Sequence, residues 1–412
     1  MLKPGTRKRL IVIGGGAAGF FCAVNAAAAN PALQVVLAEK TGKLLSKVKV
    51  SGGGRCNVTH ACFDINELAK NYPRGQHFVK KTFHQFNTKD TIEWFEKRNV
   101  QLKTEPDGRM FPVTDSSQTI INCLLNEADK YGVQILLHTE IKKIEKHTDV
   151  FELQSNHGTL SADFICIACG SFSKLAQFDW LKQLGHSIEE PLPSLFTFNI
   201  PGNNIRSLMG VSSDNASVKI KGSKLMQTGA ILITHWGLSG PAVLKLSAYA
   251  AKELSAMHYD FTVIINWLPG YNENSLREEW HGLRNQFSAQ KINNKKPFSL
   301  PQRLWSYFLD ECGISHELRW ADVPAASQNK LIKTLTAQEV QVKGKTTFKE
   351  EFVTCGGITL SEVDANTMQS KIAPGLFFAG EVMDADGITG GFNFQHAWTS
   401  GWIAGKSIAA LV

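Results

Sequence analysis

The amino-acid sequence predicts an α/β fold built around a parallel sheet, and three observations near the N-terminus carry this prediction. Residues 9–13 (RLIVI) are a short apolar run followed by glycines, as a buried central strand is. A glycine turn at 14–19 leads into the Ala-rich segment 20–29, which favours a helix ending near Asn30. Residues 33–39 (LQVVLAE) form a second strand. Strand, turn, helix and strand in this order make one unit of a doubly wound sheet.

The size and composition of the chain indicate a multidomain globular protein. Its 412 residues predict two or three domains, and 43% hydrophobic with 20% charged residues is ordinary for such proteins. No apolar run approaches the roughly 18 residues that a membrane span needs. The basic N-terminus lacks the pattern of a secretory signal, because glycines break the apolar stretch that follows it.

Charge and cysteine usage favour a cytoplasmic protein. The net charge is +7, and lysines gather only in small clusters at 219–224 and 291–296, which we interpret as solvated surface rather than a nucleic-acid patch. The eight cysteines have no spacing typical of a secreted disulfide framework. Cys166 and Cys169 form a C-x-x-C, but they lie in the apolar run 161–170, which predicts a buried strand rather than a redox pair.

The glycine turn has the pattern G-x-G-x-x-G and predicts dinucleotide binding. Gly14 permits the tight turn, Gly16 lets the backbone approach a pyrophosphate, and Gly19 lets the helix pack closely on the strand. The start of the helix offers free N–H groups to the phosphates. Glu39, 20 residues after Gly19, is placed to accept hydrogen bonds from the ribose hydroxyls and disfavours a 2′-phosphate. The alternative is a glycine turn that only packs.

Residues 41–57 predict a loop that cradles phosphates. The segment carries Lys43, Lys47, Lys49 and Arg55 together with four small residues at 51–54, so cations and backbone donors can converge on an anion. The alternative is a flexible surface loop. Cys56 is a conceivable catalytic thiol, although no partner base is evident.

The middle of the chain completes the first domain and then changes character. Residues 63–132 are mostly helical in pattern, with a turn at Asp107–Gly108, and strands follow at 133–147, 150–156 and 161–170. From Pro191 the sequence becomes rich in strands, to residue 270. Pro241 fits the first position of a helix, and His235 before it is a candidate to face a substrate or a structural histidine. Residues 272–336 are polar and helical, and 339–344 return to strand.

These changes set the expected domain boundaries. Residues 1–192 and 344–412 form the nucleotide-binding domain, 193–270 and 337–343 an inserted β-rich substrate domain, and 271–336 a small helical subdomain.

The C-terminal segment indicates which dinucleotide is bound. Residues 375–381 (GLFFAGE) are a short apolar strand that ends in Gly380 and Glu381, where FAD proteins return to the cofactor. A helix after residues 389–393 would point its N-terminus at the flavin and stabilise its reduced anion. Two segments more than 300 residues apart therefore appear in one predicted site, and this favours FAD over NAD.

The sequence resembles the YhiN-like, BaiN-type bacterial flavoproteins, a group of NAD(P)/FAD-dependent oxidoreductases. The matching stretches are VIGGGAAG, SGGGRCN, GRMFP, THWGLSGPAVLKLS, TCGGI and GLFFAGEVMDADGITGGFNFQHAWTSG. The resemblance implies a Rossmann-like FAD-binding domain with an inserted β-barrel-like domain and a small helical domain. Cys169 replaces the Thr of a common Ala-Thr-Gly turn, so the hydroxyl contact of that turn is not expected here.

The pattern and the resemblance together give a set of expected FAD contacts. They are Gly14, Gly16, Ala17, Ala18, Gly19, Glu39, Lys40, Lys47, Ser51, Gly53, Gly54, Arg55, Cys56, Asn57, Ala168, Gly170, Gly380, Glu381, Gly390, Gly391, Phe392 and Asn393. No catalytic residue is identified; Lys47, Cys56 and His235 are the candidates, and no metal site is expected.

The leading function is an FAD-dependent oxidoreductase that transfers a hydride between flavin N5 and a small organic substrate, an enone, ketone or amine. No second glycine fingerprint is present, so a stable NAD domain is not expected, while transient reduction by NAD(P)H stays open. An oxidase is equally compatible with the sequence. The alternatives are a flavoprotein that modifies or binds RNA, suggested by the two lysine clusters, and a non-catalytic FAD protein. No membrane contact is expected, and the oligomeric state is not predicted.

Overall fold

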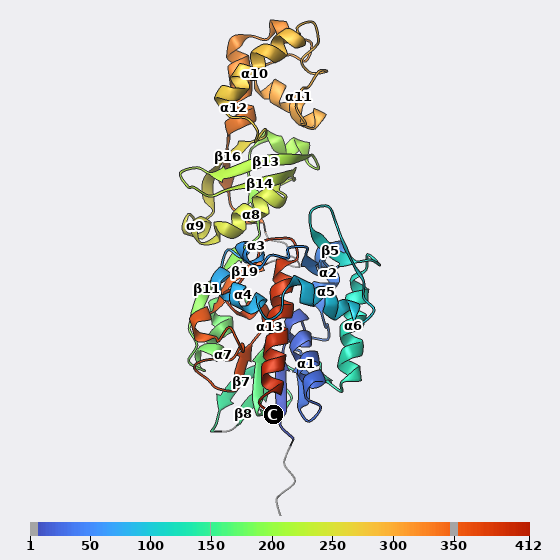
Figure 1. Cartoon of the computed structure of the whole chain (residues 1–412). Helices are drawn as coiled ribbons and strands as arrows, with labels where there is room; N and C mark the ends of the chain where they lie inside the picture. Colours follow the sequence, from blue (N-terminus) through green and yellow to red (C-terminus); the bar gives the residue numbers. More distant parts are fainter. Residues whose placement is uncertain (1–6, 149, 347–352) are drawn as a thin grey trace, which may run out of the picture. The chain divides into compact units, whose positions relative to one another are not determined.

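The protein is described by a computed structural model that covers residues 7–148, 150–346 and 353–412 (Figure 1). It divides into two compact units, the first comprising Met1–Pro193 with Lys349–Val412 and the second Ser194–Phe348. Within the described residues, no helix is both long and apolar enough to cross a membrane.

A parallel sheet of five strands forms the centre of the first unit. In spatial order it contains β20 (Leu376–Phe378), β10 (Phe164–Ile167), β1 (Arg9–Ile13), β2 (Gln34–Ala38) and β6 (Gln134–Leu136). All four pairings are parallel. The strands predicted at both ends of the sequence are confirmed, and the C-terminal strand β20 lies two positions from β1.

The first and last helices of the unit pack closely against one another. They are α1 (Ala17–Ala29) and α13 (Phe392–Ala409). A Cβ added to Gly401 would lie 2.6 Å from Ala18 O, and one added to Gly405 would lie 2.5 Å from Cys22 O. Glycine is required at both positions because the two helix backbones approach so closely. Figure 1 shows the two helices side by side.

The remaining elements of the first unit surround this centre. The helices are α2 (Ser46–Gly54), α3 (Ile65–Lys70), α4 (Gln76–Phe83), α5 (Thr88–Glu96), α6 (Ser117–Lys130) and α7 (Asp179–Lys182). The smaller sheets are β3 (Thr59–His60), β5 (Arg109–Pro112) and β4 (Leu102–Thr104); β7 (Ile141–Lys146), β8 (Phe151–Ser155) and β9 (Gly158–Ala162); and β11 (Ile188–Ser194) with β19 (Val353–Ile358).

Residues 41–57 differ from the predicted loop. Residues 46–50 form the helical part of α2, and the helix is interrupted by non-helical angles at Ser51, Gly52 and Gly53. Gly52, Gly53 and Gly54 all have positive φ, between 57° and 85°. The glycines therefore break the helix, while the lysine-rich part before them is regular.

The second unit is an antiparallel sheet with helices. Its strand order is β17 (Gln338–Lys343), β16 (Asp260–Asn266), β13 (Ser212–Ile220), β14 (Met226–Ile233), β15 (Gly237–Ser239), β12 (Thr197–Asn199) and β18 (Lys345–Thr346). Helix α8 (Pro241–Tyr249) begins at Pro241 as predicted and is followed by α9 (Ala251–Ala256). The predicted helical segment contains α10 (Glu273–Gln286), α11 (Gln302–Glu311) and α12 (Ala325–Ala337). Trp280, Trp305 and Trp320 are fully buried in the core of this unit.

Candidate functional site

Two glycines of the turn after β1 are required by the fold itself. A Cβ on Gly14 would lie 2.4 Å from Ala168 O, and Gly14 has a φ of +114°. A Cβ on Gly19 would lie 1.9 Å from Gly14 O. Gly14 also donates its N–H to Ala38 O at 2.8 Å, and Ala168 donates to Ile13 O at 2.8 Å. The turn is thereby joined to the carboxyl ends of β2 and β10, where ligands of open α/β sheets bind.

Gly16 has no such structural requirement. It is the N-cap of α1 with an ordinary φ of −94°, and a Cβ added there would meet nothing within 4 Å. The space beside it lies at the start of α1, where Ala17 and Ala18 begin the helix and the first N–H groups have no helical partner. A helix N-terminus with open space beside a glycine fits a pyrophosphate group. The residues present therefore fit the dinucleotide that the sequence predicts.

A cavity of about 480 Å³ adjoins this turn. Its lining includes Gly14, Glu39, Lys40 and Cys169, and the Glu39 carboxylate is held by Gly15 N–H at 2.8 Å and Thr41 N–H at 2.9 Å. The volume is within the range of pockets that hold small ligands. The cavity is also lined by residues that the sequence analysis missed, namely Thr139, Glu140, Ile141, Lys142, Phe172, Ala176, Gln177 and Trp180. They follow β6 and β10, so their position after two strand ends was the available signal.

The C-terminal segment reaches the same end of the sheet. Gly380 has a φ of +74° and donates its N–H to Ser400 Oγ at 2.8 Å, and its added Cβ would lie 2.8 Å from Ala18 Cβ. Glu381 forms an ion pair with Lys47 of α2. The structure thus brings together residues near position 18, residues of α2 and the segment after β20, as the sequence predicts.

Asn57 connects the glycine-rich segment to the start of α13. In the amide orientation that satisfies both of its polar atoms, it accepts from Gly391 N–H at 3.0 Å and donates to Thr59 O at 3.0 Å. Gly390 and Gly391 have φ values of +128° and +96°. A Cβ on Gly391 would lie 2.6 Å from Thr59 O, so the approach of the two segments requires glycine there.

The first residues of α13 are fixed by contacts within the protein. Asn393 accepts from Gly387 N–H at 2.8 Å and donates to Gly387 O at 2.9 Å. Phe392 stacks on His60, with ring centroids 4.7 Å apart, and its carbonyl accepts from the Tyr72 hydroxyl at 2.6 Å. Both polar atoms of the Asn393 amide are engaged by Gly387, which fixes the start of the helix.

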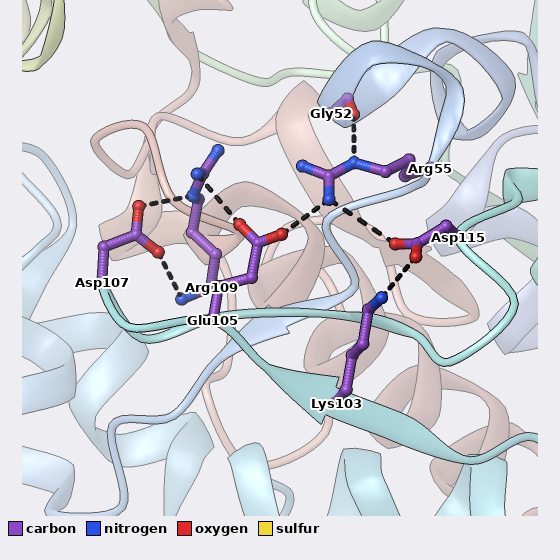
Figure 2. A network of polar contacts seen from close by, with 7 residues as sticks. All are labelled: Gly52, Arg55, Lys103, Glu105, Asp107, Arg109 and Asp115. Atoms are coloured by element: carbon purple, nitrogen blue, oxygen red, sulfur yellow. Dashed lines mark hydrogen bonds and ion pairs between the residues drawn. The ribbon is translucent and has the colours of Figure 1, made fainter.

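Arg55 is the centre of a polar network at the end of α2 (Figure 2). Its guanidinium lies 4.0 Å above the Phe111 ring, and Nη1 is 2.6 Å from Glu105 Oε1 and 3.5 Å from Asp115. Glu105 also pairs with Arg109. The hydrogen bond to Glu105 and the negative charges of Glu105 and Asp115 raise the pKa of Arg55. The network anchors the kinked segment, in which Gly53 and Gly54 are exposed with open space around their Cα atoms.

The three candidate catalytic residues have different environments. Cys56 is fully buried, and burial raises the pKa of its thiol to about 12, which does not favour a thiolate. Lys47 is half exposed and paired with Glu381. His235 belongs to the second unit, where it is exposed and its ring lies 4.0 Å from that of Trp236.

Ser51, a predicted cofactor contact, donates its hydroxyl to Val48 O at 3.1 Å within α2.

The C-x-x-C pair lies at the end of a buried strand, as the sequence predicts. Cys166 is on β10, where the neighbouring Cys22 thiol and burial raise the pKa of Cys166, and burial raises the pKa of Cys169 to about 12. All eight cysteines are free thiols. Gly170 follows with a φ of +76° and no atom near its added Cβ.

A second polar cluster in the first unit has the atoms of a hydrolase triad but not its environment. Ser370 Oγ lies 3.0 Å from His186 Nε2, and His186 Nδ1 lies 2.9 Å from Glu362. Ser370 is buried, and its oxygen also accepts the N–H groups of Ile372 and Ala373. Because the hydroxyl is occupied and enclosed, the cluster stabilises the fold.

Comparisons with known proteins agree with this geometry. The family model "HI0933-like protein Rossmann domain" matches residues 8–407. The chain is 32% identical to the ribosomal RNA dihydrouridine synthase of Escherichia coli K12, covering 97% of this chain and 98% of that protein. It is 24% identical to the 3-dehydro-bile acid delta(4,6)-reductase of Clostridium scindens, covering 97% and 99%.

The fold is similar to that of a dehydrogenase of known structure. The 3-ketosteroid-delta4-(5alpha)-dehydrogenase of Rhodococcus jostii RHA1 gives a TM-score of 0.54 at 13% identity, over 99% of this chain and 98% of that chain. At this identity the likeness concerns the fold alone. The family match over residues 8–407 and the full-length relatives identify the chain as a member of the HI0933-like family and as an FAD-dependent oxidoreductase.

Proposed function

We propose that the protein reduces a carbon–carbon double bond conjugated to a carbonyl group, and that its substrate is a uracil base in RNA. The observation that carries the proposal is that two full-length relatives are both named for such a reduction. Dihydrouridine is uridine with a saturated C5–C6 bond, and in uracil that double bond is conjugated to the C4 carbonyl. A delta-4,6 diene beside a 3-oxo group is conjugated in the same way. When bound, reduced FAD would supply the hydride from N5 to one carbon of the double bond, and a proton would complete the new C–H bond at the other carbon.

Residues of the first unit have distinct roles in this proposal. The start of α1 beside Gly16 binds the pyrophosphate, Glu39 binds the ribose, and the 480 Å³ cavity holds the adenine. The N-terminus of α13 and Lys47 place positive potential near the reduced flavin and stabilise its negative charge. Arg55 and Asn57 act as positioning residues, because their contacts fix the glycine-rich segment and the start of α13.

We place RNA before a small organic molecule as the candidate substrate because of the functions for which the two full-length relatives are named. From the sequence alone, an enone, ketone or amine ranks first and RNA second. The E. coli relative reverses this order, since it is 32% identical over the whole chain, against 24% for the Clostridium relative. An RNA substrate also agrees with the cytoplasmic location that the cysteine content favours.

The test uses the purified holoprotein under anaerobic conditions. NADH or NADPH is added first, and bleaching of the flavin absorbance reports whether nicotinamide acts as a transient donor. Ribosomal RNA transcribed in vitro is then added, and mass spectrometry measures the gain of two hydrogens per reduced uracil. If the chemically reduced flavin is never reoxidised by RNA and no dihydrouridine forms, RNA is not the substrate.

A small conjugated ketone is the second candidate, and the Clostridium relative favours it. A 3-oxo-4,6-diene steroid is added to the reduced holoprotein in place of RNA. Reoxidation of the flavin by the steroid and not by RNA would select this candidate. An amine that bleaches the oxidised flavin, with no response to nicotinamide, would instead identify an oxidase.

A further inference from the structure

The charge of the protein is concentrated in one of its two units. The second unit, residues 194–348, contains 17 Lys and Arg residues against 11 Asp and Glu, a net charge of +6. The first unit contains 27 against 26, a net charge of +1. Nearly all of the +7 of the chain therefore belongs to the unit without the glycine turn. A basic unit in a chain whose other unit is nearly neutral is typical of a polyanion-binding domain.

The basic residues of this unit include a group on one face of its sheet. Helix α8 packs against β13 and β14 on the buried face, with Val218 and Ile220 pointing into the core. The other face is open to solvent. We define this open face by its exposed residues, Lys219, Lys221, Met226, Glu339, Gln341 and Lys343, and by Lys224 in the turn that joins β13 to β14.

Strand register explains why these side chains share one face. Lys219 is paired with Met226 of β14 on one side and with Ile264 of β16 on the other, and Ile264 is paired with Glu339 of β17. Lys343 lies four residues beyond Glu339, so it points to the same side. Both Lys219 and Lys343 are exposed, as this alternation requires.

Three of the cations are available to a ligand. Lys221 pairs with Glu339 at 2.7 Å. Within residues 150–346, Lys219, Lys224 and Lys343 form no ion pair. Met226 beside Lys219 is 54% exposed, which provides an apolar contact next to the charges. Unpaired lysines with an exposed apolar side chain suit a phosphate backbone carrying sugars and bases.

We infer that the open face is a docking surface for the phosphate backbone of an RNA substrate. The inference rests on the proposed function and adds to it which unit holds the RNA. Contacts of this kind carry little sequence information, so the open face contributes affinity and salt dependence, while the choice of base is left to the flavin site.

The experiment compares two triple variants of the holoprotein with equal charge changes. K219Q/K224Q/K343Q removes three cations of the open face, and K80Q/K81Q/K89Q removes three exposed lysines of the first unit. Fluorescence anisotropy measures binding of a labelled 20-nucleotide polyuridylate between 50 and 300 mM KCl. Far-UV circular dichroism and the melting temperature confirm that both variants fold.

The open-face variant is expected to bind the RNA on the order of tenfold more weakly than wild type. The slope of log affinity against log salt concentration is expected to be shallower by about 2, because each of the three lost phosphate contacts on a single strand contributes about 0.7 to that slope. The control variant is expected to bind as wild type. Equal losses in the two variants, no loss in the first, or wild-type binding that does not respond to salt would each overturn the inference. The inference is also overturned if the open-face variant binds anionic lipid vesicles more weakly than wild type does but binds RNA equally well.

The outcome is separable from that of the proposed function. If wild type binds RNA through these lysines but forms no dihydrouridine, docking stands and the proposed reaction fails. If dihydrouridine forms at wild-type rate at subsaturating RNA in the open-face variant, the reaction stands and the docking surface is wrong.

Discussion

Lys47 and Glu381, 334 residues apart in the sequence, form an ion pair at 2.5 Å that joins α2 to the segment after β20. Lys47 is 53% exposed and Glu381 16%, so solvent screens the pair mainly from the lysine side. Removing either partner changes the charge that the other presents to the flavin site.

Substitutions in this pair are expected to shift the flavin midpoint potential in opposite directions. Lys47→Met removes a positive charge and lowers the potential, because the reduced anion is less stabilised. Glu381→Gln releases the lysine and raises it. We expect shifts on the order of 10 to 30 mV, where 30 mV equals about 1.4 kcal/mol for a two-electron couple. Equilibration with reference dyes measures them. Lys49→Met, two residues further along α2, is the control and leaves the potential unchanged.

Gly16 and Gly14 are expected to respond differently to substitution. Gly16→Val keeps the apo-protein melting temperature, because the added atoms enter open space, but fills the place of the pyrophosphate and weakens FAD binding by about tenfold or more. Gly14→Ala places a Cβ 2.4 Å from Ala168 O at a positive φ and destabilises the apo-protein by about 2 kcal/mol or more. Reconstitution titrations followed by flavin fluorescence, with urea unfolding, check both. Unchanged FAD affinity in Gly16→Val would contradict the assigned pyrophosphate position.

The buried ion pair of Arg74 and Asp386 is expected to matter far more than an exposed one. Arg74 Nε is 2.5 Å from Asp386 Oδ1, and the side chains are only 10% and 3% exposed. Asp386→Asn removes the carboxylate that pairs with this buried guanidinium, for an expected loss of about 3 to 5 kcal/mol of unfolding free energy. Glu93→Gln, which removes the exposed pair with Lys97, is expected to cost less than about 1 kcal/mol. Urea unfolding compares the two, and losses of equal size would disprove the contrast.

His396 is expected to make the protein sensitive to acid. Burial lowers the pKa of His396 from 6.5 to about 4, and neither ring nitrogen has a hydrogen-bond partner among the described residues. The unfolded chain therefore binds the proton more tightly than the folded one. The unfolding free energy is therefore unaffected by His396 above pH 6.5, and protonation of this histidine in the unfolded chain lowers it by up to about 3 kcal/mol as the pH falls toward 4. Burial lowers the pKa of His186 too, which adds in the same direction.

Unfolding free energies of wild type and His396→Gln between pH 4 and 7 test this expectation. The variant is expected to lose less stability on acidification. His281→Gln, which changes an exposed histidine of α10, serves as control and keeps the wild-type dependence. A wild-type slope in His396→Gln would show that acid acts through other groups.

The local pattern of apolar residues, glycine and proline was sufficient to predict several strands and one helix start. The apolar strands β1, β2 and β20 and the start of α8 at Pro241 lie where the sequence predicts them. The helical part of α2 was missed because its lysines and small residues have no clear periodicity, and its helix depends on the contacts of Val48 in the core.

The cavity walls could not be predicted for a different reason. Trp180, Phe172 and Thr139 come from segments that meet only because β6 and β10 lie on opposite sides of β1 and β2 in the sheet. Strand order is a tertiary property that no single segment encodes. The same applies to Arg55, whose partners Glu105 and Asp115 lie on either side of β5.

The close packing of α1 on α13 has a consequence for biosynthesis. The first unit needs residues from both ends of the chain, because β20 and α13 complete the sheet and helix layer begun by β1 and α1. The second unit is continuous in sequence and has its own core. During synthesis, the second unit can therefore fold while the first still waits for its last helix, and cofactor loading is confined to the time after α13 has left the ribosome.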